Sequence, residues 1–140
     1  MISSRGRYAL RVMLDMAKQH STQNISVRDL AARQNISRKY LESIMTALCK
    51  ANLIESETGK DGGYRLRRAP EEYTAGEVLR AVEGELAPVS CVTPAGKKCD
   101  GACGCIALPF WQGLEQHINT YVDSYTLQDL LTSQQEKKEN

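Results

Sequence analysis

Two short segments with helical spacing of apolar residues follow one another between residues 26 and 50, separated by a turn of three or four residues. The first begins at Ser26 and has Asp29 three residues later, the capping-box pattern of a helix N-terminus. The second begins at Ser37, and its apolar face consists of Tyr40, Leu41, Ile44, Met45 and Leu48. Two short helices joined by so short a turn predict a helix-turn-helix, in which the second is the recognition helix.

A glycine-rich segment after the second helix predicts a β-hairpin. Residues 53–56 and 64–67 flank the sequence Thr58-Gly-Lys-Asp-Gly-Gly63, whose glycines can supply positive φ angles at the hairpin tip. A hairpin in this place is the wing of a winged helix-turn-helix. Lys60 at its tip and Arg65 on its second strand are candidates to contact phosphates or a minor groove.

The charges of the chain separate into two halves, although its net charge is only +1. Residues 1–68 contain 13 Lys and Arg against 6 Asp and Glu, a net +7, whereas residues 69–140 contain 5 against 11, a net −6. A basic head beside an acidic half is typical of a phosphate-binding module joined to a partner or sensor module. A chance division of a solvated surface is the alternative.

The remaining segments are predicted to be mainly helical. A first helix should run from Ser3 or Ser4 to about His20, and the capping box Thr74-Ala-Gly-Glu77 should open a helix that packs on the N-terminal module. A long helix over residues 108–125 carries an apolar stripe that consists of Trp111, Leu114, Ile118, Tyr121, Val122 and Tyr125. The stripe favours pairing with a second copy in a homodimer, with an ordinary core face as the alternative.

The predicted fold class is therefore mainly α with a small β-hairpin wing, a winged helix-turn-helix followed by a long C-terminal dimerisation helix. We divide the chain into a DNA-binding domain (1–82), a cysteine-rich sensor loop (83–107), the dimerisation helix with a short terminal helix (108–132) and a disordered polar tail (133–140).

Several short motifs together resemble a known family. They are Gly6-Arg-Tyr-Ala-Leu10, Tyr40-Leu-Glu42, Gly62-Gly-Tyr64, Thr74-Ala-Gly-Glu77 and Cys99-x5-Cys105 followed by Trp111. With these motifs the chain resembles, up to about Leu131, the winged-helix regulators that include the iron-sulfur cluster regulator IscR, the nitric oxide sensor NsrR and the cysteine-metabolism regulator CymR. The resemblance implies a homodimer on a near-palindromic operator in double-stranded DNA, with recognition helices in successive major grooves and wings in minor grooves.

The resemblance also implies which residues contact DNA. The matching positions of the recognition helix are Ser37, Arg38, Lys39, Tyr40, Glu42 and Ser43. Glu42 is suited to accept from a cytosine amino group, and the basic and hydroxyl side chains to hold phosphates. The iron-sulfur regulator has an arginine before the first wing glycine, where this chain has Thr58, so Lys60 is the candidate for the minor-groove role.

Four of the five cysteines lie between Cys91 and Cys105. The chain has no secretory signal and no apolar run long enough to cross a membrane, so we expect a cytoplasmic protein whose cysteines bind metal or react with oxidants. The resemblance implies Cys91, Cys99 and Cys105 as ligands of an iron-sulfur cluster, of 2Fe or 4Fe type, and leaves Cys103 as a further candidate. Zinc, or thiols that switch by oxidation, are the alternatives.

The familiar fourth ligands are missing, because Leu108 and Tyr8 occupy the positions of the histidine and the acid that serve in the iron-sulfur and nitric oxide regulators. Cys103, another residue or an open iron position remain as alternatives. Cys49 is expected to be a buried structural thiol, and His20 and His117 to be surface groups. No nucleophile and base pair up, so the sequence predicts a transcriptional regulator, expected to be a repressor that senses iron-sulfur status, nitric oxide or redox state, and not an enzyme.

Overall fold

The capping patterns of the sequence define where the helices begin. A computed structural model describes residues 1–19, 23–92 and 105–139. Its elements are α1 (Ser4–Lys18), α2 (Val27–Gln34), α3 (Arg38–Lys50), β1 (Ile54–Glu57), β2 (Gly63–Leu66), η1 (Pro70–Glu72), α4 (Ala75–Glu83), η2 (Ser90–Val92), α5 (Leu108–Asp123) and α6 (Leu127–Glu139). The predicted winged helix-turn-helix is confirmed. No described helix is long and apolar enough to span a membrane.

Side-chain caps hold the helix ends as the sequence predicts. The hydroxyl oxygens of Ser26, Ser37 and Thr74 each accept a hydrogen bond from the backbone N–H three residues later, at 3.1 Å in all three cases. Asn35 ends α2 with φ of 55°, and Asn52 follows α3 with φ of 60°, as expected for asparagine in the left-handed region. Local sequence therefore fixes the limits of the helix-turn-helix.

The wing is an antiparallel hairpin that is fixed to the rest of the domain. Strands β1 and β2 pair with Glu55 opposite Arg65, and Tyr64 also exchanges two backbone hydrogen bonds with Ile25, of 2.8 and 2.9 Å. A Cβ on Gly63, whose φ is 151°, would overlap the backbone of Ile25. Glycine is therefore required where β2 meets the segment before α2.

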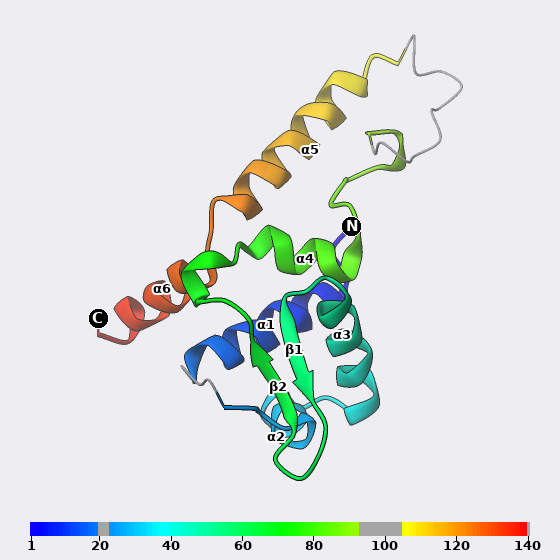
Figure 1. Cartoon of the computed structure of the whole chain (residues 1–140). Helices are drawn as coiled ribbons and strands as arrows, with labels where there is room; N and C mark the ends of the chain where they lie inside the picture. The colour runs from blue at the N-terminus through cyan, green and yellow to red at the C-terminus, as the bar shows by residue number, and fades with distance from the viewer. Residues whose placement is uncertain (20–22, 93–104, 140) are drawn as a thin grey trace.

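One apolar core joins α1, α2, α3, α4 and the start of α6 (Figure 1). Its fully buried members include Met13, Leu30, Leu41, Tyr73 and Leu127. Helix α4 lies between this domain and α5, which extends away from it, and α6 returns beside α1 (Figure 1). Helix α4 contacts α1, α3 and α5, so it joins α5 to the helical core.

The C-terminal end differs from the expectation. Helix α6 continues to Glu139, where the sequence suggested a disordered tail from residue 133. Residues 133–139 are Ser, Gln, Gln, Glu, Lys, Lys and Glu, most of which are good helix formers despite their polarity, so a helix begun at Leu127 can continue through them.

Candidate DNA-binding surface and cysteine region

Helix α3 separates its apolar and polar residues onto two faces. Leu41, Ile44, Met45 and Leu48 have no exposed surface. The opposite face consists of the exposed residues Ser37, Arg38, Lys39, Glu42 and Ser43. Five of the six residues proposed from the sequence for this helix are thus available to a ligand. The sixth, Tyr40, is half-buried and packs edge-on against Tyr8, with ring centroids 5.9 Å apart.

Contacts from α1 hold the recognition helix in place. The guanidinium of Arg5 donates to the carbonyl oxygen of Ser43 at 3.1 Å. The Ser43 hydroxyl donates to the carbonyl of Tyr40 at 2.7 Å, and Glu42 lies 3.9 Å from Arg38 across one helical turn. An exposed ion pair at that distance contributes little to stability, so the Glu42 carboxylate can leave Arg38 and accept a hydrogen bond from another donor.

The wing places its two candidate residues differently. Lys60 is exposed at the tip, as expected. Arg65 instead binds the acidic strand opposite, with guanidinium nitrogens 2.9 Å from Glu55 and 3.2 Å from Glu57, and a further hydrogen bond of 3.4 Å to Asn24. A hydrogen bond from Asn24, followed by the charge of Arg65, lowers the pKa of Glu57. Arg65 therefore stabilises the hairpin in this structure.

A buried tyrosine that the sequence analysis did not single out holds the root of the wing. The Tyr73 hydroxyl accepts from the backbone N–H groups of Arg67 and Arg68, at 2.9 and 3.0 Å, and donates to the carbonyl of Leu53 at 2.6 Å. Three hydrogen bonds at one buried hydroxyl tie the segment after β2 to the segment before β1. The sequence offered only one signal for it, its place directly before the Thr74 cap.

The structure describes only two members of the cysteine cluster. Cys91 is half-buried in η2, and Cys105 is exposed before α5, where its carbonyl accepts from the N–H of Leu108 at 3.3 Å. Segment η2 contacts α5, and Cys105 lies three residues before that helix begins, so both thiols belong to segments that adjoin α5. Cys99 and Cys103 fall outside the described residues, within which no group of three potential ligands occurs. Thiols on either side of residues 93–104 have the donor chemistry that soft metals and iron-sulfur clusters need.

The other potential ligands lie elsewhere. Cys49 on α3 is half-buried, where the sequence suggested a buried thiol. Desolvation by its surroundings raises the pKa of this thiol, and a hydrogen bond with Ser56 opposes that rise only in part. The ring nitrogen Nδ1 of His117 lies 2.8 Å from the carbonyl oxygen of Gly113 on exposed α5. His20 lies outside the described residues.

Helix α5 divides its predicted apolar stripe between the core and the surface. Val122 is buried with Leu79 and Leu86, and Ile118 packs against them. Tyr121 is 64% exposed, and Phe110, which the predicted stripe did not include, is 65% exposed. A hollow of about 830 Å³ lies along this helix, lined by Ile2, Gln116, His117, Ile118, Thr120, Tyr121, Val122 and Ser124.

Comparisons with known proteins give a consistent result. Residues 2–133 match the Rrf2 family, described as an iron-dependent transcriptional regulator. The chain is 35% identical to the HTH-type transcriptional regulator IscR of Aliivibrio salmonicida over 130 residues, which cover 93% of this chain and 76% of that protein. The solved structure of IscR from T. potens has a TM-score of 0.78 at 31% identity, covering 98% of this chain and 90% of that one. The oxidized form of Staphylococcus aureus CymR has a TM-score of 0.70 at 34% identity, covering 93% and 94%.

Proposed function

Because the chain belongs to the Rrf2 family of transcriptional regulators, which are not enzymes, we propose that it binds operator DNA as a homodimer and represses transcription under the control of its cysteines. The observation that carries the proposal is the division of α3, whose polar face is exposed while its apolar face is completely buried. A helix held in this way presents its N-terminal side chains to a major groove.

In the proposed complex Ser37, Arg38 and Lys39 contact phosphates, and Glu42 accepts from a cytosine amino group. Tyr40 and Ser43 adjoin the same groove, although Tyr40 is available only in part. Lys60 enters the minor groove from the wing tip. Arg65 can contribute only if it leaves Glu55 and Glu57, so we assign it a supporting role in the hairpin.

The proposed dimer forms along α5. Phe110, Leu114 and Tyr121 are exposed at spacings of four and seven residues, which place them along one side of the helix. A two-fold axis makes this surface its own partner, and apolar side chains of a second copy would fill the hollow beside Ile118. Replacing Tyr121 with Glu should convert a dimer into monomers in sedimentation experiments, whereas a monomeric wild type would contradict the proposal.

For the sensor we propose an iron-sulfur cluster bound by Cys91, Cys99 and Cys105, with Cys103 as a further candidate ligand. The support is the resemblance to cluster-binding regulators and the donor chemistry of the two described thiols. Loss or oxidation of the cluster would reposition residues next to α5 and shift the dimer between states of different DNA affinity. A redox switch of the same thiols is the second candidate, favoured by the similarity to a regulator whose oxidized form has been solved.

The DNA-binding proposal is tested by selecting duplexes from a random pool with the wild-type protein and measuring affinity at several salt concentrations. Arg38→Ala should weaken binding on the order of tenfold and reduce the salt slope by about one, whereas Lys137→Ala on α6 should change neither. Wild-type binding that does not depend on salt, or no enrichment of any duplex, would contradict the proposal.

The sensor is tested by anaerobic purification followed by iron, sulfide and zinc analysis. Cys91→Ser and Cys105→Ser should lose iron and the visible absorbance, and Cys49→Ser, the matched control, should keep both. Colourless, iron-free wild type would overturn the cluster. Zinc in that sample would support a zinc site, and a disulfide formed on oxidation would support the redox switch.

A further inference from the structure

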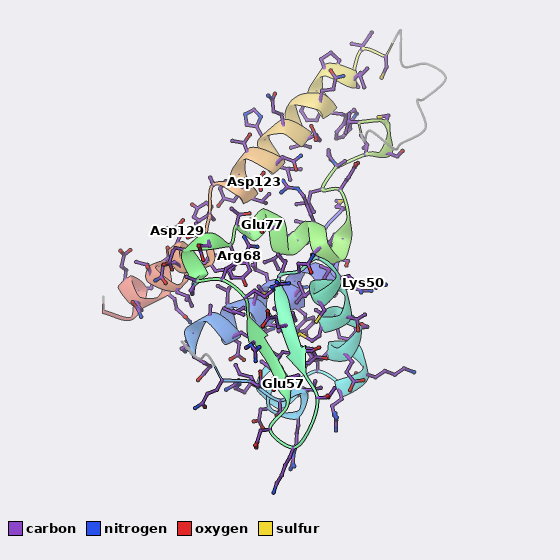
Figure 2. All side chains as sticks on the ribbon, viewed as in Figure 1. Lys50, Glu57, Arg68, Glu77, Asp123 and Asp129 are labelled. Carbon is purple, nitrogen blue, oxygen red and sulfur yellow. The ribbon has the colours of Figure 1, made fainter. Side chains whose placement is uncertain are left out.

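Two ion pairs, Arg68–Glu77 and Arg80–Asp123, meet on α4, where Glu77 and Arg80 are three residues apart and the charge of Glu77 helps to raise the pKa of Arg80. The four residues are Arg68 after β2, Glu77 and Arg80 on α4, and Asp123 at the end of α5. Figure 2 shows three of them, Arg68, Glu77 and Asp123, in the region where the wing root, α4 and α5 come together. We call these two ion pairs the wing–α5 link.

At the wing end, Arg68 is held from three directions. Its guanidinium lies 2.7 Å from the carboxylate of Glu77, donates to the carbonyl of Glu72 at 2.9 Å, and stacks over the ring of Tyr73 at 4.3 Å from the centroid. Planar guanidinium groups held on so many sides have few alternative positions. Arg68 thus connects α4 to the segment that follows β2 through its ion pair with Glu77.

At the other end, Arg80 binds α5 through both terminal nitrogens. They lie 2.7 and 2.9 Å from the two carboxylate oxygens of Asp123, and one also donates to Asn119 at 2.7 Å. A Cβ on Gly76 would overlap the side chains of Asp123 and Arg80, so glycine leaves room for this ion pair against α4. The bidentate geometry resists rotation of α5 against α4.

We propose that the wing–α5 link sets the position of each wing relative to the dimer helix and thereby selects the spacing between DNA half-sites. Glu77 and Arg80 are positioning residues in this scheme, since neither side chain belongs to the polar face of α3 or to the wing tip. The inference rests on the proposed function, because half-site spacing has meaning only for a dimer that pairs along α5. A change at the thiols that adjoin α5 would move this helix and, through the wing–α5 link, the wing.

Charge supplies a clean test of this role. Glu77→Gln and Asp123→Asn each raise the net charge by one, which by itself strengthens the attraction to DNA phosphates. A loss of spacing selectivity in these variants cannot therefore come from weaker electrostatic attraction. Glu71→Gln and Glu85→Gln make the same charge change at exposed positions and serve as matched controls.

The experiment uses the full chain and the duplex selected by the wild type, together with duplexes that have one base pair added to or removed from the centre. The ratio of affinities for the selected and altered spacings should fall about fivefold in Glu77→Gln and Asp123→Asn and stay constant in both controls. Arg80→Lys keeps the charge but loses the bidentate contact, and it should lower the ratio as well. Circular dichroism confirms that each variant is folded.

Unchanged ratios in folded Glu77→Gln, Asp123→Asn and Arg80→Lys would overturn the link while leaving the DNA-binding proposal intact. A wild type that binds the selected duplex but ignores spacing would overturn the link and the paired α5 helices together. A wild-type protein that selects no duplex would contradict the proposed function itself, before the link is tested.

Discussion

The hydroxyl group of Tyr73 is expected to be one of the most consequential polar groups in the domain. Tyr73→Phe removes the acceptor for two backbone N–H groups and the donor to the Leu53 carbonyl, while the ring keeps its place under Arg68. Each hydrogen bond is worth about 1 kcal/mol net, and buried groups left without a partner cost about 1–3 kcal/mol. We therefore expect a loss of ~3 kcal/mol in the free energy of unfolding.

Urea unfolding at a fixed protein concentration measures this loss, because the stability of the proposed dimer would depend on concentration. With a slope of roughly 2 kcal/mol per molar urea, the midpoint should fall by about 1.5 M. Tyr8→Phe is the control, since the Tyr8 ring also packs on a neighbour but its hydroxyl has no hydrogen bond among the described residues. If the free energies of unfolding of Tyr73→Phe and Tyr8→Phe differ by less than about 0.5 kcal/mol, the three hydrogen bonds of Tyr73 do not stabilise the wing as we argue.

Three further changes test other parts of the domain. Gly63→Ala should destabilise the wing by about 2 kcal/mol or more, because the added Cβ meets the backbone of Ile25; unaltered thermal unfolding would refute the need for glycine. Ser37→Ala should cost ~1 kcal/mol through loss of the α3 cap, measured by urea unfolding, and stability equal to wild type would contradict the cap. Burial alone would raise the pKa of Glu83, but hydrogen bonds from Ser3 and Gly6 lower it below its ordinary 4.5. The contribution of Glu83 to the free energy of unfolding is therefore complete above pH 4.5 and is lost as the pH falls through the folded pKa. Glu83→Gln should accordingly flatten the acid limb of a stability–pH profile, and an unchanged limb would exclude this role.

The sequence predicted the helix-turn-helix well because its signals act locally. A serine or threonine cap needs only the backbone three residues away, and an asparagine in the left-handed region needs no distant partner. Ser26, Ser37 and Thr74 therefore occupy the roles assigned to them. The buried face of α3 followed from periodicity for the same reason.

Features that depend on residues far apart in the chain were harder to predict from the sequence. Arg65 was a candidate to contact phosphates or a minor groove, and the sequence did not predict that the register of the hairpin puts Glu55 directly opposite it, where a cross-strand ion pair forms. Tyr73 acts on the start of the hairpin twenty residues earlier in the chain. No periodicity or cap predicts such a contact, because it arises only when the chain folds back and brings Tyr73 against Leu53.

Ion pairs show which basic side chains of the N-terminal half are already paired with carboxylates. Its 13 basic residues include Arg65, Arg67 and Arg68, and a carboxylate of Glu55, Glu57 or Glu77 lies within 3.4 Å of each of these guanidinium groups. Lys39 and Lys60, by contrast, are exposed and make no ion pair among the described residues. The paired arginines stabilise the wing root, and the unpaired lysines, with Arg38, are the basic residues that the proposed function assigns to phosphates. Of these three acids only Glu77 belongs to the acidic half, and its ion pair with Arg68 ties the wing root to α4.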